Sequence, residues 1–293
     1  MRLYSVLLLL VAALAGCSDV AGADQNESVV VFVLDSPINV DFLEGRVVGL
    51  RASDVTHGSL VGRVLRGYCR APLMCVTAEG IEGSPDRSAY LSGLRSVLDH
   101  VRQHPDVKLV VNISLAFPAP AAEEEELIRR ITAAGALVVA AAGNEDSAAP
   151  MYPAAYPGVV AVASATRDGK ALNSNFGPHI NIAASGDISF IDYEFLPYER
   201  LRREMEARGT SFAAPRVAAT AAYLMRHDPR LSPREAYRIL ESTAGPMDDA
   251  YYRDGMLGAG LLDIYRAKCV VSPTYRFVHF VLPVSIWIVL GVI

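Results

Sequence analysis

The chain has 293 residues, of which 52% are hydrophobic and 20% are charged, and its formal net charge is −5 at pH 7. A small negative charge without a basic cluster argues against nucleic acid as a partner. Without its two hydrophobic ends the chain keeps about 250 residues, which is enough to bury one large core.

The chain begins with the pattern of an export signal. Arg2 precedes an apolar stretch at residues 6–14 that is too short to span a bilayer, as in a secretory signal. The stretch ends in Leu-Ala-Gly followed by Cys17, which resembles the bacterial lipoprotein cleavage box. That resemblance implies a signal peptide at residues 1–16 and a lipidated Cys17 that opens a tether at residues 17–28. An ordinary signal peptide with a chance cysteine is the alternative.

Both interpretations of the N-terminus place the protein outside the cytoplasm. Lipidation of Cys17 adds a membrane anchor, so we expect the protein in the bacterial cell envelope, on the periplasmic side or at the outer membrane. Ser18, rather than Asp, follows the cysteine, and the same resemblance implies that this residue permits sorting to an outer membrane.

From residue 29 onward, short valine-rich runs alternate with amphipathic stretches. We expect strands at residues 29–34, 46–50, 73–77, 108–113, 137–141 and 159–163. We expect helices at residues 59–65, 87–102, 121–134, 215–226 and 233–242. This alternation favours βα units on a mainly parallel sheet. In such sheets the chemistry lies beyond the carboxyl ends of the strands, where Asp35 and Asn144 fall.

Four residues supply the groups that nucleophilic acyl transfer needs: a serine, a base, a carboxylate that orients the base and a donor to the oxyanion. Asp35 ends an apolar run, His57 opens another apolar segment, and Asn144 follows a third. Ser211 precedes an alanine-rich helix, where free backbone N–H groups and the positive end of the dipole favour an anion. A serine in that position can also be a simple N-cap.

The residues around these four resemble the motifs of the subtilisin-like serine peptidases, with the triad in the chain order Asp, His, Ser. The chain carries them as Asp-Ser-Pro at 35–37, His-Gly-Ser at 57–59, Ala-Ala-Gly-Asn at 141–144 and Gly-Thr-Ser-Phe-Ala-Ala-Pro at 209–215. Further similarity lies at residues 152–162, 174–177 and 258–263. The resemblance implies a subtilisin-like peptidase domain at residues 29–268 with a three-layer α/β/α fold.

The resemblance implies a serine endopeptidase that acts on protein or peptide substrates. In it His57 takes the proton of Ser211, Asp35 orients His57, and Asn144 with the Ser211 N–H binds the oxyanion. This chemistry requires no cofactor. Structural calcium is common in the family, but its ligands cannot be assigned from this sequence.

The same resemblance implies which residues contact the substrate. Ser114, Leu115 and Ala116 match the strand that pairs with the substrate backbone and forms one wall of the primary specificity pocket. Ala142 and Gly143 are also assigned to substrate binding by the resemblance.

Several features depart from the family pattern. Pro37 replaces a glycine and removes a backbone donor next to Asp35. Where the family often has glycine after Ser-Leu, the chain has Ala116, followed by Phe117 and Pro118, so we expect a narrowed cleft. We also expect no folding-assistant propeptide before the domain. These departures motivate two alternatives: a catalytically silent subtilisin-fold binding or scaffold protein, and a peptidase restricted to one partner protein. Residues 188–208 match no motif and receive no role.

The cysteines other than Cys17 are Cys69, Cys75 and Cys269. In an oxidising exported compartment, Cys69 and Cys75 are close enough in sequence to form a disulfide that closes one loop, and we expect this bond. Buried free thiols are the alternative.

The acidic run at residues 123–126 opens a helix that continues to Arg129 and Arg130. The helix dipole and i,i+4 pairing explain this run, with calcium binding as the alternative.

The last part of the chain, residues 269–293, is a hydrophobic tail. As a helix its apolar stretch at 277–293 would reach about 26 Å, slightly short of a bilayer core of about 30 Å. Basic residues precede the stretch and none follows, which opposes the usual charge bias for a segment that enters from the exported side. We expect a membrane segment, with a buried strand or docking segment as the alternative.

Overall fold

The computed structural model describes residues 28–39, 47–49, 55–78, 85–196, 199–272 and 275. The predicted signal peptide at 1–16, the lipidated Cys17 and the apolar stretch at 277–293 lie outside these residues. None of the helices in the described part of the chain combines the length and the apolar character that a bilayer span needs.

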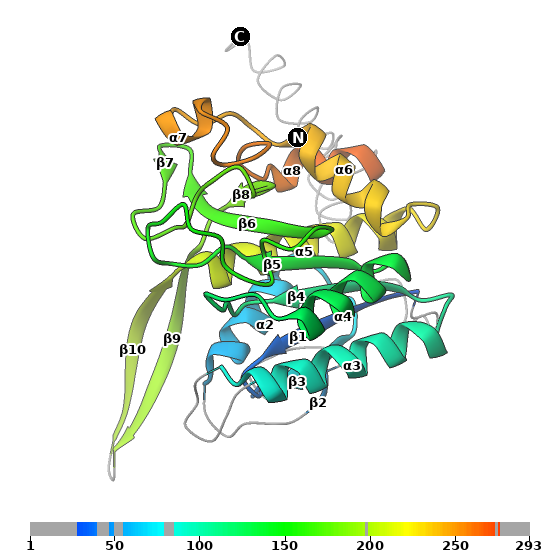
Figure 1. The fold of residues 1–293 in the computed structure, drawn as a ribbon. Helices are drawn as coiled ribbons and strands as arrows, with labels where there is room; N and C mark the ends of the chain where they lie inside the picture. The colour runs from blue at the N-terminus through cyan, green and yellow to red at the C-terminus, as the bar shows by residue number, and fades with distance from the viewer. Residues whose placement is uncertain are drawn as a thin grey trace, which may run out of the picture.

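The centre of the molecule is a mainly parallel sheet with the strand order β2-β3-β1-β4-β5-β6-β7, in which β8 also pairs with β6 (Figure 1). Its strands are β1 (Val29–Asp35), β2 (Val47–Gly49), β3 (Leu73–Thr77), β4 (Lys108–Ile113), β5 (Leu137–Ala141), β6 (Val159–Thr166), β7 (Gly169–Lys170) and β8 (Ile182–Ala184). Only the β6–β7 pair is antiparallel among the described strands of this sheet. The valine-rich runs form strands here because both sheet faces are covered, so successive side chains are all buried.

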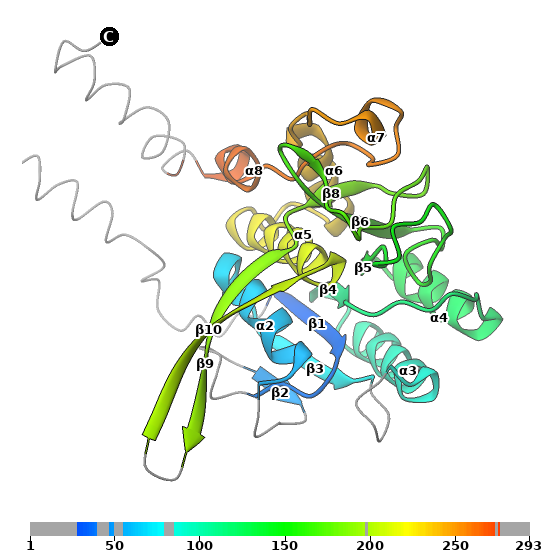
Figure 2. The same cartoon turned by 90° about the vertical axis from the view of Figure 1, so that its left-hand side faces the viewer.

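Helices cover both faces of the sheet, which confirms the predicted α/β fold. They are α2 (His57–Tyr68), α3 (Arg87–Gln103), α4 (Ala122–Ala133), α5 (Thr210–His227), α6 (Pro233–Thr243), α7 (Ala250–Arg253) and α8 (Ile264–Val271). Figure 2 shows α2 and α5 on one side of the sheet and α3 and α4 on the other. Strand β1 contributes side chains to both cores: Val31 belongs to the core cluster under α2 and α5, while Phe32 belongs to the cluster under α3 and α4.

The segment without a sequence motif forms a long two-stranded hairpin. Strands β9 (Asp187–Leu196) and β10 (Glu199–Arg208) pair antiparallel, and the hairpin projects from the body of the molecule (Figures 1 and 2). Its second strand ends at Arg208, just before helix α5. The hairpin therefore joins the sheet to the helix that carries Ser211.

The predicted helix at 215–226 is longer than expected, because α5 already begins at Thr210. Pro215 lies inside this helix and has no N–H to donate to the carbonyl of Ser211 four residues earlier. The hydroxyl of Ser114 donates to that carbonyl instead, over 2.9 Å. A tertiary hydrogen bond thus satisfies the acceptor that the proline leaves open.

The predicted disulfide between Cys69 and Cys75 is wrong, since both residues are buried free thiols. Cys69 ends helix α2, where its sulfur accepts from the Ala71 N–H, and Cys75 lies opposite Val33 in the β1–β3 ladder. These elements fix the two residues independently of a disulfide. Burial raises the pKa of the Cys75 thiol to about 12 and also raises that of Cys69, so both thiols stay protonated.

Candidate active site

Asp35 and His57 meet where strand β1 ends and helix α2 begins. Asp35 is 4% exposed, and its Oδ1 accepts hydrogen bonds from His57 Nδ1 and from the Ser36 N–H, each over 2.7 Å. The His57 side chain is 40% exposed. An ionised carboxylate only accepts, so Nδ1 carries the proton and the opposite ring nitrogen, Nε2, is left as an acceptor in the neutral ring.

The close approach of these two elements depends on Gly58. A Cβ at this position would lie 2.2 Å from the backbone oxygen of Ser36, and the Gly58 N–H donates to Ser36 Oγ over 2.6 Å. Thr56 caps α2 by accepting from the Ser59 N–H, and its hydroxyl donates to the carbonyl of Pro37. Pro37 therefore ties the end of β1 to the start of α2.

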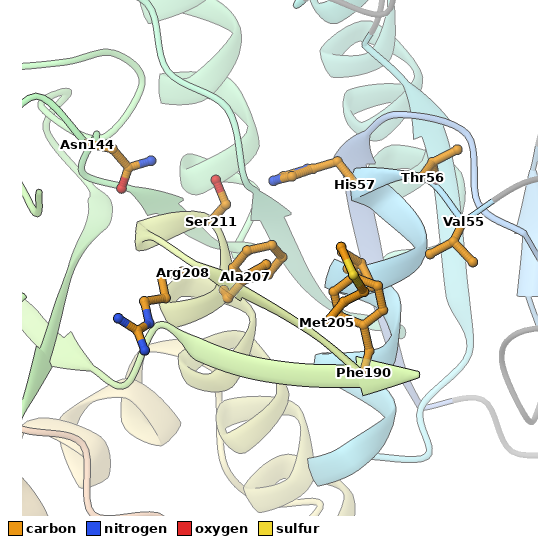
Figure 3. A pocket seen from close by; sticks show the side chains of 11 residues that line it. Val55, Thr56, His57, Asn144, Phe190, Met205, Ala207, Arg208 and Ser211 are labelled. Carbon is orange, nitrogen blue, oxygen red and sulfur yellow. The ribbon is translucent and has the colours of Figure 1, made fainter. Parts of the chain in front are cut away.

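Ser211 is the second residue of α5 and comes from a different part of the chain. Its hydroxyl donates to the Ser114 carbonyl over 3.1 Å. In Figure 3 this hydroxyl and a ring nitrogen of His57 face each other. The Phe212 ring packs against the His57 ring, with the centroids 5.4 Å apart. Gly209 precedes the helix at φ 151°, a conformation that favours glycine, and a Cβ there would press against the Asn144 amide at 3.2 Å.

Asn144 lies beyond the carboxyl end of β5, and Thr210 fixes the orientation of its amide. Its Oδ1 accepts from the Thr210 N–H over 2.9 Å and from the Thr210 hydroxyl over 3.1 Å. Because the oxygen is held in this way, the NH₂ group points toward Ser211 (Figure 3). This is the geometry of a donor aimed at a charge that develops beside the serine.

Asn175 holds the turn that carries Asn144. Its Oδ1 accepts from the Glu145 and Ser147 N–H groups over 2.9 and 3.2 Å, and its Nδ2 donates to the Ala142 carbonyl over 3.0 Å. Asn175 is 0% exposed. Sequence reasoning noted the Ser-Asn-Phe-Gly similarity at 174–177 but assigned it no role, although a buried amide in a matched motif was the available signal.

Of the predicted substrate-contact residues, Ser114 contacts Ser211 and Gly143 contacts its neighbour Thr210. Ser114 exchanges two hydrogen bonds with Ser211, Leu115 is buried, and Ala116 is half-buried. Ala142 donates its N–H to Val162 within the sheet, and the Gly143 N–H donates to the Thr210 hydroxyl.

A cavity of about 440 Å³ adjoins the serine and the histidine. One part of its wall is made by His57, Asn144 and Ser211, and the opposite part comes from the β9–β10 hairpin (Figure 3). The described residues contain no cluster of three or more His, Cys, Asp or Glu side chains that would hold a metal ion.

The acidic run at 123–126 has ordinary protein partners. Glu126 accepts from Arg129 over 2.8 Å, Glu123 pairs with Arg95, and Glu124 is buried against Arg87. Sequence reasoning anticipated pairing within the helix, but it missed that Glu124 points into the protein.

A family model described as the subtilase family matches residues 74–264, a span that includes Asn144 and Ser211 and begins after His57. Subtilisin-like protease 1 of Trichophyton rubrum is 29% identical over 220 residues, which cover 69% of this chain and 42% of that protein. A subtilisin-like protease of Coccidioides posadasii is 34% identical over 172 residues, which cover 58% of this chain and 42% of that protein. The chain thus spans less than half the length of these two curated relatives.

Two solved structures share the fold. A lanthipeptide protease aligns with a TM-score of 0.67 at 17% identity, covering 84% of this chain and 88% of the other. A protease from Pseudoalteromonas arctica aligns with a TM-score of 0.63 at 23% identity, covering 83% of this chain and 90% of the other.

Proposed function

Because the chain belongs to the subtilase family, we propose that it is a serine endopeptidase that cleaves peptide bonds through an acyl-enzyme formed on Ser211. The observation that carries this proposal is the 2.7 Å hydrogen bond between buried Asp35 and His57, with Ser211 and Asn144 lining the same cavity as His57. The curated relatives are named as proteases, which supports a protein or peptide substrate.

Each of the four side chains has a defined role in the proposed mechanism. His57 accepts the Ser211 proton as the serine oxygen bonds to the substrate carbonyl carbon, and Asp35 stabilises the resulting imidazolium. The Asn144 amide and the Ser211 N–H donate to the oxyanion. His57 then passes its proton to the leaving nitrogen as the peptide bond breaks. Water attacks the acyl-enzyme by the same route, and no metal or cofactor takes part in these steps.

The proposed place of action is the bacterial cell envelope. The support comes from the sequence alone: an apolar stretch at residues 6–14 is followed by a lipoprotein-like box at Cys17. Lipidation of Cys17 would hold the domain at a membrane surface, on the periplasmic side or at the outer membrane.

A fluorophosphonate probe tests the catalytic proposal directly, because it reacts with a serine that an adjacent base has activated. The wild-type protein should be labelled and the Ser211→Ala variant should not. Absence of labelling in folded wild-type protein would contradict the enzyme and favour the silent scaffold. Circular dichroism of both proteins supplies the folding control.

A further inference from the structure

The base of the β9–β10 hairpin presents a row of apolar side chains to the cavity. Met205 lies opposite Phe190 in the antiparallel register, and Ala207 lies opposite Ile188, so these four residues share one face of the hairpin. Ile188, Phe190 and Ala207 pack against the core cluster under α5. Met205 is 41% exposed, although it is a large apolar residue. The hairpin is therefore fixed at its base and leaves an apolar wall uncovered there.

The facing wall comes from the start of helix α2. Val55 lies there near His57 (Figure 3). Leu60 of α2 and Phe212 of α5 line the same space, together with Phe190 and Met205. Apart from His57, Arg208 is the one ionisable side chain among the described residues that line the cavity. The part of the cavity between the hairpin and the start of α2 is thus apolar, and the charge of Arg208 at its edge is paired with Asp187 and Glu206.

The chemistry of the proposed reaction indicates which side of the scissile bond lies next to the hairpin cavity. His57 must deliver a proton to the leaving nitrogen, so the residue that follows the scissile bond lies beside the His57 ring. The end of β4, which the family resemblance assigns to the other half of the substrate, contacts Ser211 through Ser114 and does not line this cavity. The hairpin cavity therefore adjoins the leaving side.

We propose that the base of the β9–β10 hairpin forms a specificity pocket for the residue immediately after the scissile bond, and that it selects an apolar side chain over a charged one. The proposal rests on the proposed endopeptidase function. Met205 and Phe190 supply the apolar contact, and a charged side chain placed against them would lose its hydration without gaining a partner. A pocket of this kind discriminates by about tenfold or more between side chains that fill it and side chains that do not.

The test is the cleavage profile of a peptide library made by digesting a proteome with a glutamate-specific protease, which leaves Lys and Arg at internal positions. The cleaved bonds are identified by mass spectrometry, and the residue after each bond is compared with its frequency in the library. We expect Leu, Ile, Met and Phe to be enriched about tenfold over Lys and Arg. A residue distribution after the bond that matches the library overturns the proposal.

Variants assign the preference to the hairpin. Met205→Ala should reduce the apolar enrichment several-fold. A purely structural effect would scale all cleavages equally and leave the ratios unchanged, which would overturn the proposal. Leu172→Ala is the matched control, because Leu172 is 92% exposed and does not line the cavity, so its profile should equal that of the wild type.

The outcomes separate this proposal from the one on which it rests. Failure of the fluorophosphonate to label Ser211 removes the endopeptidase, and the pocket with it. If Ser211 is labelled but the residues after the cleaved bonds match their library frequencies, only the pocket is overturned. The same holds if Ser211 is labelled and no library peptide is cleaved.

Discussion

At the scale of single residues, hydrogen bonds from Thr210 and Asn175 prepare the side chain of Asn144 for chemistry. Thr210 holds the oxygen of Asn144 and leaves its NH₂ group toward Ser211. Asn175 holds the backbone on both sides of Asn144, through Ala142 and Glu145. The donor is therefore positioned before any substrate binds, which is the condition under which an oxyanion donor is most effective.

Asn144→Ala should lower kcat by about 10²–10³, the usual loss when a serine protease loses one oxyanion donor. KM should change little, because the amide interacts with charge that develops only in the transition state. The variant should also lose about 1–3 kcal/mol of stability, since the buried Thr210 N–H loses its acceptor. Kinetics measured well below the melting temperature separate the two effects. A variant with full kcat would refute the oxyanion role.

Asn175→Ala should lower kcat by about tenfold through displacement of Asn144, and it should have almost no further effect in the Asn144→Ala background, because coupled residues are not additive. The measurement is a double-mutant cycle on kcat. Asn181→Ala is the control: Asn181 also accepts from a backbone N–H, that of Ala161, but it does not touch the turn. Equal kcat losses for Asn175→Ala in both backgrounds would show that Asn175 is only a structural residue.

At the scale of elements, a buried carboxyl group attaches helix α4 to helix α3 and to the loop that precedes β6. Glu124 is 0% exposed, and its Oε2 accepts from Arg87 and from the Tyr156 hydroxyl, each over 3.1 Å. Burial raises the pKa of Glu124 above its usual value, against the opposing effect of Arg87. The folded protein therefore binds this proton more tightly than the unfolded chain does.

This pKa shift predicts a pH dependence with a definite sign. The favourable contribution of Glu124 is fully present below its unfolded pKa of about 4.5 and is lost as the pH rises through the raised folded pKa. Glu124→Gln removes the titration, so the variant should gain free energy of unfolding relative to the wild type between about pH 4 and pH 8. Urea denaturation across this range measures the difference. A difference that does not vary with pH would contradict the prediction.

Glu126→Gln is the matched control on the same helix. Hydrogen bonding to Arg129 lowers the pKa of Glu126, so its contribution is present above the unfolded pKa and lost as the pH falls. The Glu126→Gln variant should therefore lose stability relative to the wild type as the pH rises, the opposite sign to Glu124→Gln.

At the scale of the whole molecule, helix α8 belongs to the folded domain. Its residue Ala267 is fully buried in the core cluster that also contains residues of α5. A truncation that tests membrane anchoring must therefore spare α8. Removal of residues 276–293 leaves this helix intact, whereas a cut before residue 271 would expose part of the core.

The anchoring proposal predicts that deletion of residues 276–293 leaves the protein in the membrane fraction of a bacterial host that processes lipoproteins. Each buried CH₂ of the acyl chains on Cys17 contributes about 0.8 kcal/mol to membrane binding. Cys17→Ser combined with the deletion should release the protein into the soluble fraction, as immunoblots of the two fractions will show. Complete release by the deletion alone would contradict lipidation of Cys17.

The sequence by itself determined the elements whose signal is local. Valine-rich runs must be buried on both faces, and they became the strands of a parallel sheet, while amphipathic stretches became its covering helices. The motifs around Asp35, His57, Asn144 and Ser211 also drew attention to residues that the fold brings together, since Asp35 binds His57, and His57, Asn144 and Ser211 line one cavity.

Only the tertiary structure decided the hairpin and the contacts between distant segments. Residues 199–208 are rich in Glu, Arg, Leu and Met, which favour helix, yet they form β10 because β9 offers a full set of backbone partners. Likewise, the hydrogen bonds of Asn175 to the Asn144 turn and of Ser114 to Ser211 join residues far apart in the chain. Such contacts leave no local pattern, because their partners become neighbours only after the strands and helices have packed.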